Sequence, residues 1–127
     1  EEARRFKDMY RLVFRKGVLL EERGMEEDAI TAYRRCFDHD ATDVPNLLRL
    51  GALYAKRGED SDALRVLQAA LLHQTKVEKT DRVGLFYRLG SVRASMGESR
   101  KARDMYQRAL SIDPEHKPTL AALEDLG

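Results

Sequence analysis

The sequence predicts an all-α fold, an α-solenoid of three stacked antiparallel helical hairpins followed by one further helix. Glycine pairs with one internal spacing recur three times, at Gly17 and Gly24, Gly51 and Gly58, and Gly90 and Gly97. An alanine follows each pair at a constant distance, at Ala29, Ala63 and Ala102. Between the first glycines of successive pairs the step is 34 residues and then 39, a period typical of helical-hairpin arrays. Arrays of this kind present a long binding surface, so we expect a binding protein and no catalysis.

Composition agrees with a single helical domain. Of the 127 residues, 43% are hydrophobic and 35% charged, which allows a continuous core beneath a solvated outer face. The 23 Lys and Arg residues nearly balance the 22 Asp and Glu residues, for a formal charge of +1. Because no overall field attracts nucleic acid or an anionic membrane, we expect any electrostatic recognition to be local.

The sequence says less about the cellular compartment of the protein and about whether the chain is part of a larger one. Cys36 is the only cysteine, so it excludes an internal disulfide and suits a reducing compartment, for which we expect the cytoplasm. No apolar run approaches the roughly 20 residues that a membrane span needs. The chain begins at Glu1 without a methionine, and we expect a fragment of a larger protein or a processed product.

The helices are expected at seven ranges, 9–23, 26–38, 45–57, 60–75, 82–96, 99–111 and 118–126. Asp43 and Asp81 predict helix starts, and Pro114 predicts a stop. The longer step places five extra residues in the range 73–82. This range has no proline or glycine, so we expect it to lengthen both flanking helices.

Numbering each copy from one gives units of about 10–43, 44–82 and 83–116, with a terminal segment 117–127, all in a single domain 1–127. Position 8 is then a glycine inside the first helix, where it costs about 0.5–1 kcal/mol relative to alanine. We expect this glycine to let the first helix approach small residues at positions 20 and 27 of the second helix. Large apolar residues at positions 4 and 24 then fill the space beside the contact. The glycine at position 15 is expected to end the first helix in a left-handed conformation.

These positions resemble the tetratricopeptide repeat, whose pattern has Leu at position 7, Gly at 8, Tyr at 11, Ala at 20, an aromatic at 24, Ala at 27 and Pro at 32. The segment 109–114, Ala-Leu-Ser-Ile-Asp-Pro, looks like the end of such a unit, and the resemblance covers about 10–116. Lys16 at position 7 and Arg93 at position 11 depart from the pattern. The first hairpin is therefore either an edge unit or the neighbour of a missing one. Segment 117–127 is either a cap or the truncated start of a fourth unit.

The resemblance implies that the first helices line a concave groove in which positions 5, 6 and 9 face a ligand. Position 6 is an arginine in every copy, namely Arg15, Arg49 and Arg88. Positions 5 and 9 carry Phe14, Leu48 and Tyr87, and Val18, Ala52 and Ser91. We expect this groove to bind an extended or helical peptide with acidic side chains or a free C-terminal carboxylate beside an apolar anchor. The alternative is that the arginines are solvated, or that they bridge to neighbouring acids such as Glu21 and Glu22.

Chaperone-binding members of the family use a five-residue clamp of Lys, Asn and Arg side chains. The corresponding positions here hold Phe14, Val18, Arg49, Gly84 and Arg88, of which only the last matches. We do not expect this chain to recognise a chaperone tail with that clamp.

No motif for catalysis, cofactors or metals is present. The sequence has no phosphate-binding glycine loop, no zinc-protease motif and no paired cysteines. His39 and His73 belong to different hairpins, and Cys36 stands where the other copies have alanine, so we expect structural roles for all three. Three alternatives to peptide binding remain: a segment of a longer superhelix or self-association through apolar termini, an RNA-binding helical repeat, and regulation of an attached catalytic domain. Balanced charge argues against nucleic acid.

Overall fold

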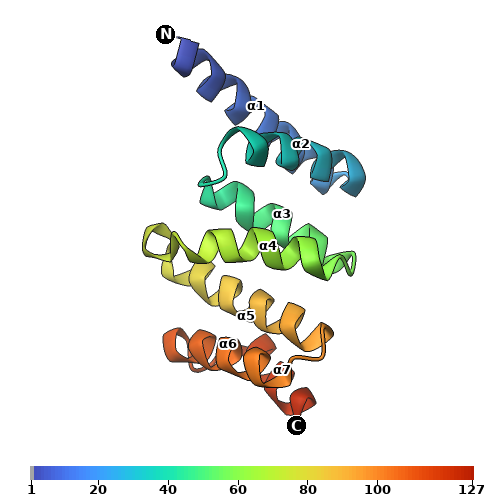
Figure 1. Ribbon diagram of the computed structural model, residues 1–127, viewed down its shortest axis with the longest axis vertical. Helices are drawn as coiled ribbons and strands as arrows, with labels where there is room; N and C mark the ends of the chain where they lie inside the picture. Colours follow the sequence, from blue (N-terminus) through green and yellow to red (C-terminus); the bar gives the residue numbers. More distant parts are fainter. Residues whose placement is uncertain (1) are drawn as a thin grey trace.

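The computed structural model describes residues 2–127, and over this range it contains seven α-helices and no strand. The helices are α1 (Glu2–Glu22), α2 (Glu26–His39), α3 (Val44–Lys56), α4 (Asp60–Leu71), α5 (Lys79–Ser95), α6 (Ser99–Ile112) and α7 (Lys117–Leu126). They stack in chain order into an elongated array with the termini at opposite ends (Figure 1). The predicted all-α solenoid is confirmed.

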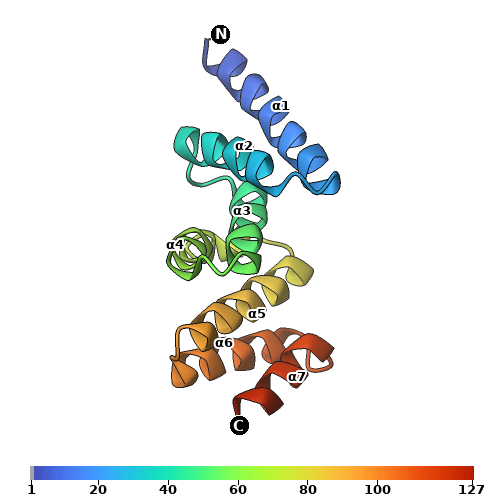
Figure 2. The ribbon, with the colours of Figure 1, turned by 90° about the vertical axis from the view of Figure 1, so that its right-hand side faces the viewer.

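Each hairpin pairs a first helix with the second helix that follows it: α1 with α2, α3 with α4, and α5 with α6. Consecutive hairpins join through α2 and α3 and through α4 and α5, and α7 packs on α6 (Figure 2). Direct contacts also link α3 with α5, and α5 with α7, whereas α2 and α4 stay farther apart. The first helices therefore lie on the inner side of the stack, where a groove is expected.

The glycines at position 15 end the first helices as predicted. Gly24, Gly58 and Gly97 have φ angles of 76°, 75° and 79°. This left-handed region is disfavoured for residues with a side chain, so glycine terminates each helix at little cost.

The glycines at position 8 do make room for the second helix, but the predicted partners were wrong. A Cβ atom on Gly17 would lie 2.6 Å from Cε1 of Tyr33, and one on Gly51 would lie 2.5 Å from Cδ2 of Leu67. A Cβ on Gly90 would likewise overlap the ring of Tyr106. Because of the way the two helices cross, the residue nearest to each glycine is the large one at position 24 and not the alanine at position 20 or the small residue at 27.

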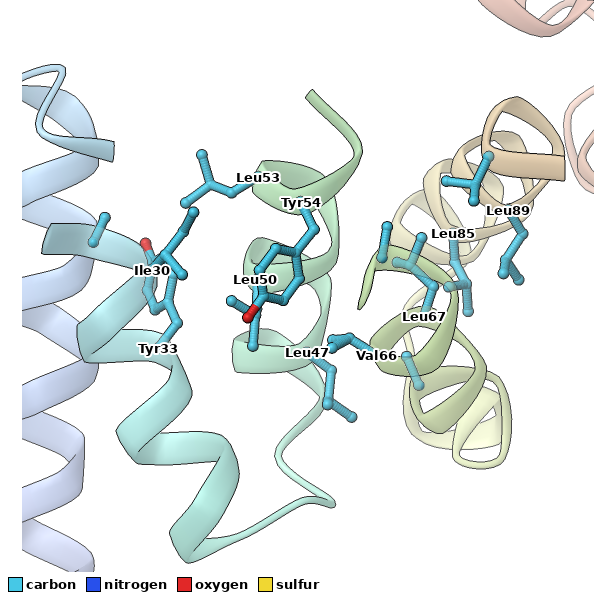
Figure 3. Close-up of a cluster of buried hydrophobic side chains, with 14 residues drawn as sticks. Ile30, Tyr33, Leu47, Leu50, Leu53, Tyr54, Val66, Leu67, Leu85 and Leu89 are labelled. Carbon is cyan, nitrogen blue, oxygen red and sulfur yellow. The ribbon is translucent and has the colours of Figure 1, made fainter. Parts of the chain in front are cut away.

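A continuous apolar core runs from α2 to α5 (Figure 3). Its members include Ile30, Tyr33, Leu47, Leu50, Leu53, Tyr54, Val66, Leu67, Leu85 and Leu89. The side chain of Asn46 is fully buried at the start of α3, and its Nδ2 donates a hydrogen bond of 2.9 Å to the backbone carbonyl of Tyr33. Burial of these apolar side chains is the main driving force for stacking the hairpins.

The five extra residues of the longer step lengthen only the helix that follows them. α4 ends at Leu71, not near residue 75, and a 3-10 turn follows at Gln74–Lys76. α5 begins at Lys79, four residues before the repeat start at Val83. The expected lengthening of both helices was therefore wrong for α4, because Val77 turns inward and is buried there. Asp81 lies within the first turn of α5 and does not start the helix.

The two ends of the stack differ from its middle. α1 begins at Glu2, earlier than the predicted residue 9. α7 has Pro118 in its first turn and a fully buried Thr119, at the repeat positions that Pro45 and Asn46 hold in α3. α7 therefore packs on α6 in the place that a first helix takes elsewhere in the array. No helix within residues 2–127 is long and apolar enough to cross a membrane.

Candidate partner-binding groove

The arginines at position 6 are exposed on α1, α3 and α5. Arg49 and Arg88 line one hollow of about 270 Å³ between α3 and α5, together with Leu48 and Ala52. We call it the arginine hollow. Arg15 lies on α1, outside the lining of this hollow. The structure therefore brings together part of the predicted set, at the centre of the stack.

Arg49 is partly neutralised by an acid of the first hairpin. Its Nη1 lies 3.4 Å from Oε1 of Glu21, and the hydroxyl of Tyr33 donates a hydrogen bond of 2.7 Å to the same oxygen. Burial, followed by the hydrogen bond to Glu21, raises the pKa of Tyr33 well above its usual range. The bridge to Glu21 that the sequence left as an alternative thus exists for Arg49, whose side chain stays 44% exposed.

Among the residues that the structure describes, the other two arginines have no acidic partner. Within residues 2–127, neither Arg15 nor Arg88 lies within 4.0 Å of an acidic oxygen. Their guanidinium groups are free to fork onto a carboxylate of a ligand.

The apolar residues predicted for the groove also pack within the fold. Phe14 and Val18 are half-buried against the core, and the ring centroid of Phe14 lies 5.7 Å from that of Tyr33. Leu48 is half-buried against the same core. Leu48 lines the arginine hollow, whereas Phe14 and Val18 do not.

In the third hairpin, the predicted groove residues Tyr87 and Ser91 also pack within the fold. The ring of Tyr87 lies 6.2 Å from Tyr106 and 5.7 Å from His116. Ser91 accepts a long hydrogen bond of 3.4 Å from the hydroxyl of Tyr106. Tyr87 is half-buried, and neither Tyr87 nor Ser91 lines the arginine hollow.

Five residues that line the arginine hollow are not in the predicted set: Glu21, Thr80, Asp81, Gly84 and Leu85. Thr80 and Asp81 line it because α5 starts a turn early. The signal that could have found them is the five-residue excess in the second step, followed at once by a glycine outside the repeat pattern.

Cys36 and His39, two of the three residues expected to be structural, pack within the fold. Cys36 is 4% exposed, and its thiol donates a hydrogen bond to the carbonyl of Tyr10. Burial raises the pKa of the Cys36 thiol, which disfavours the reactive thiolate. His39 stacks on Tyr10 with ring centroids 3.9 Å apart. Within residues 2–127 no three side chains of His, Cys, Asp or Glu are grouped as metal ligands.

The tetratricopeptide repeat family matches this chain over residues 43–115, which is more than half of it. The chain belongs to that family, whose members are generally protein-interaction scaffolds.

One relative is similar to most of this chain. The Protein CTR9 homolog of Arabidopsis thaliana is 31% identical over 108 residues, which cover 85% of this chain and 10% of the relative. The chain therefore spans about a tenth of the length of that relative.

Solved structures show the same fold. The first TPR of Spaghetti (RPAP3), bound to HSP90 peptide SRMEEVD, has a TM-score of 0.81 at 17% identity and covers 92% of this chain and 89% of its own. MamA has a TM-score of 0.83 at 24% identity and covers 94% of this chain and 63% of its own.

Proposed function

We propose that this chain is a non-enzymatic module that binds a protein partner by holding an acidic peptide segment in its concave groove. The main support is that Arg49 and Arg88, which come from successive first helices, line the same hollow. Arg88 has no acidic partner within residues 2–127. Solved relatives that hold HSP90 and HSP70 peptides support a peptide ligand.

The three arginines have unequal roles in this proposal. Arg88 is the main donor, because a charge-assisted hydrogen bond to a carboxylate contributes about 1.5–3 kcal/mol. Arg49 must share its charge with Glu21 and contributes less. Arg15 extends the basic surface toward the N-terminal end of the stack.

The proposal treats the hairpins at about 10–116 as one binding unit closed by segment 117–127. It also includes a cytoplasmic location, since the single buried thiol of Cys36 suits a reducing compartment.

The test uses fluorescein-labelled peptides and fluorescence anisotropy. The peptide GEELEEG is compared with GQQLQQG, which has the same length and apolar centre without the charges. We expect the glutamate peptide to bind at least tenfold more tightly at low salt, and its affinity to fall as salt is added. Equal affinities for the two peptides would refute the proposal.

Variants assign the binding to the groove. Arg88→Gln is expected to weaken binding of GEELEEG by about tenfold or more, the loss of one charge-assisted hydrogen bond. Arg100→Gln removes the same charge from an exposed position at the start of α6 and serves as the matched control. The groove is not the site if both variants weaken binding equally.

A second candidate function is favoured by the outer face of α1. Leu12 and Leu19, at repeat positions 3 and 10, are 65% and 53% exposed. The equivalent Leu85 and Leu53 are 1% and 3% exposed, because a preceding second helix covers them. This comparison supports a structural role in which α1 packs on a further hairpin or on another copy.

Sedimentation velocity over a wide range of protein concentration separates the two functions. The structural role is favoured if the measured mass rises with protein concentration and if the Leu19→Lys variant has the mass of a monomer. A monomer that binds the glutamate peptide favours the groove.

A further inference from the structure

Two departures from the repeat meet at the start of α5. The longer step adds the turn that begins at Lys79, and Gly84 stands where the other hairpins have Arg11 and Pro45. We propose that this place is a second subsite of the groove, which receives an apolar side chain of the bound peptide next to the carboxylate held by Arg88. This inference rests on the proposed function and names the pattern of residues that the groove selects.

The fold does not require a glycine at position 84. Gly84 has no positive φ angle, and a Cβ built on it would meet nothing within 4 Å. Gly51, in contrast, leaves space for a buried side chain of its partner helix. An interior helical glycine weakens a helix relative to alanine, so Gly84 lowers stability without improving packing. Gly84 also leaves the backbone of α5 without a side chain at this point of the surface.

The bare backbone separates two hollows. The arginine hollow lies on the side of α3. A second hollow of about 310 Å³, here called the valine hollow, lies on the side of α6 and α7. Thr80 and Gly84 line both hollows. Thr80, Gly84 and Arg88 follow one another at intervals of four residues and so share one face of α5. A peptide that crosses α5 over Gly84 would therefore contact both hollows.

The valine hollow suits an apolar side chain. Val83 is buried in its wall, Ile112 lies half-buried opposite, and its volume is at the low end of the range for ligand pockets. His116 also lines it, and its Nδ1 lies 2.7 Å from Oγ1 of Thr119. Lys79 also lines this hollow and adds a positive charge.

Three basic residues, Arg49, Arg88 and Lys79, and three acids, Glu21, Asp81 and Asp113, line the two hollows. Two of the acids at the rims are engaged within the fold: Glu21 by Tyr33 and Arg49, and Asp113 by the backbone N–H of Glu115. Arg88 remains unpaired within residues 2–127, and Asp81 is the remaining acid of the rim.

Extended peptides project successive side chains to opposite sides. One residue of the ligand thus reaches the valine hollow while the next reaches the arginine hollow. The occupant is an extended protein segment in which a residue such as leucine adjoins a glutamate or aspartate.

The experiment compares GEELEEG with GEESEEG, which replaces the apolar centre with serine. We expect the parent protein to bind the leucine peptide about tenfold more tightly, since a buried leucine side chain is worth more than that factor when fully covered. Gly84→Leu fills the crossing point and is expected to reduce this preference to less than about twofold. Gln107→Leu, on the exposed face of α6, is the matched control and should keep the preference.

A second variant distinguishes a change in folding stability from a change in peptide affinity. Gly84→Ala is expected to raise the midpoint of urea unfolding while it weakens binding of the leucine peptide. A preference for leucine that survives in Gly84→Leu overturns the inference but leaves the proposed function intact, provided that GEELEEG still binds better than GQQLQQG. If glutamate and glutamine peptides bind equally, both fall.

Discussion

Gly51 and Gly84 both lie inside first helices, yet the space around them differs. A methyl group on Gly51 would lie 2.5 Å from Cδ2 and 2.7 Å from Cγ of Leu67, a residue with no exposed surface. A methyl group on Gly84 would extend into the groove. The same substitution therefore changes packing at one site and only helix propensity at the other.

We expect Gly51→Ala to destabilise the protein by about 1–3 kcal/mol through overpacking. Gly84→Ala should stabilise it by about 0.5–1 kcal/mol, the difference in helix propensity. Urea unfolding followed by circular dichroism measures both. A stabilising Gly51→Ala would contradict the packing described for position 8.

The buried, hydrogen-bonded hydroxyl of Tyr33 makes the stability of the protein depend on pH. Its hydroxyl donates to Glu21 in a partly exposed setting, so we expect Tyr33→Phe to cost about 1 kcal/mol near neutral pH. Because the folded state holds this proton more tightly, the unfolded state loses it first, and stability falls as pH rises above about 10. Unfolding free energies measured from about pH 8 upward should show the gap between parent and Tyr33→Phe narrowing. A gap that stays constant would argue against the hydrogen bond.

At the scale of helices, equivalent positions show what each neighbour contributes. Leu19 in α1 and Leu53 in α3 occupy the same repeat position, but only Leu53 is covered by a preceding second helix. We expect Leu53→Ala to cost about 2–4 kcal/mol and Leu19→Ala less than about 1 kcal/mol. Urea unfolding at low protein concentration tests this pair. Equal losses would mean that the outer face of α1 is covered in solution.

The end of a helix was predictable from the sequence where a single residue determines the backbone conformation. Glycine at positions such as Gly24 and Gly58 ends a helix for a local reason, and the boundaries there agree with the prediction. The partner of Gly51 and the end of α4 were not predictable, because both depend on how helices cross and on where Val77 packs.

The groove was predictable only in outline. A repeated arginine placed Arg49 and Arg88 on one surface, since equal repeat positions face the same way in a stack. The sequence could not show that Glu21 joins Arg49 to Tyr33, because that contact spans two hairpins. Nor could it show the valine hollow, which closes only when α5, α6 and the start of α7 meet.

The whole molecule is a one-dimensional array, because the extensive contacts link only neighbouring helices or neighbouring hairpins. Stability should therefore vary along the chain. In hydrogen exchange measured by mass spectrometry, we expect the first turns of α1 and the last turn of α7 to exchange fastest. Segments of α3 and α4 should exchange slowest, since hairpins cover them on both sides. Uniform protection would indicate a single cooperative unit instead.

The buried amide of Asn46 makes the stacking order specific. The junctions of the array hold three different residues at this repeat position: Asn46 between the first and second hairpins, Leu85 between the second and third, and Thr119 at the end. At the first junction this amide donates to the backbone carbonyl of Tyr33. A stack that brought Leu85 into this junction would lose that hydrogen bond, which contributes about 0.5–1.5 kcal/mol. Stacking of the hairpins in the wrong order is therefore disfavoured even though the units look alike.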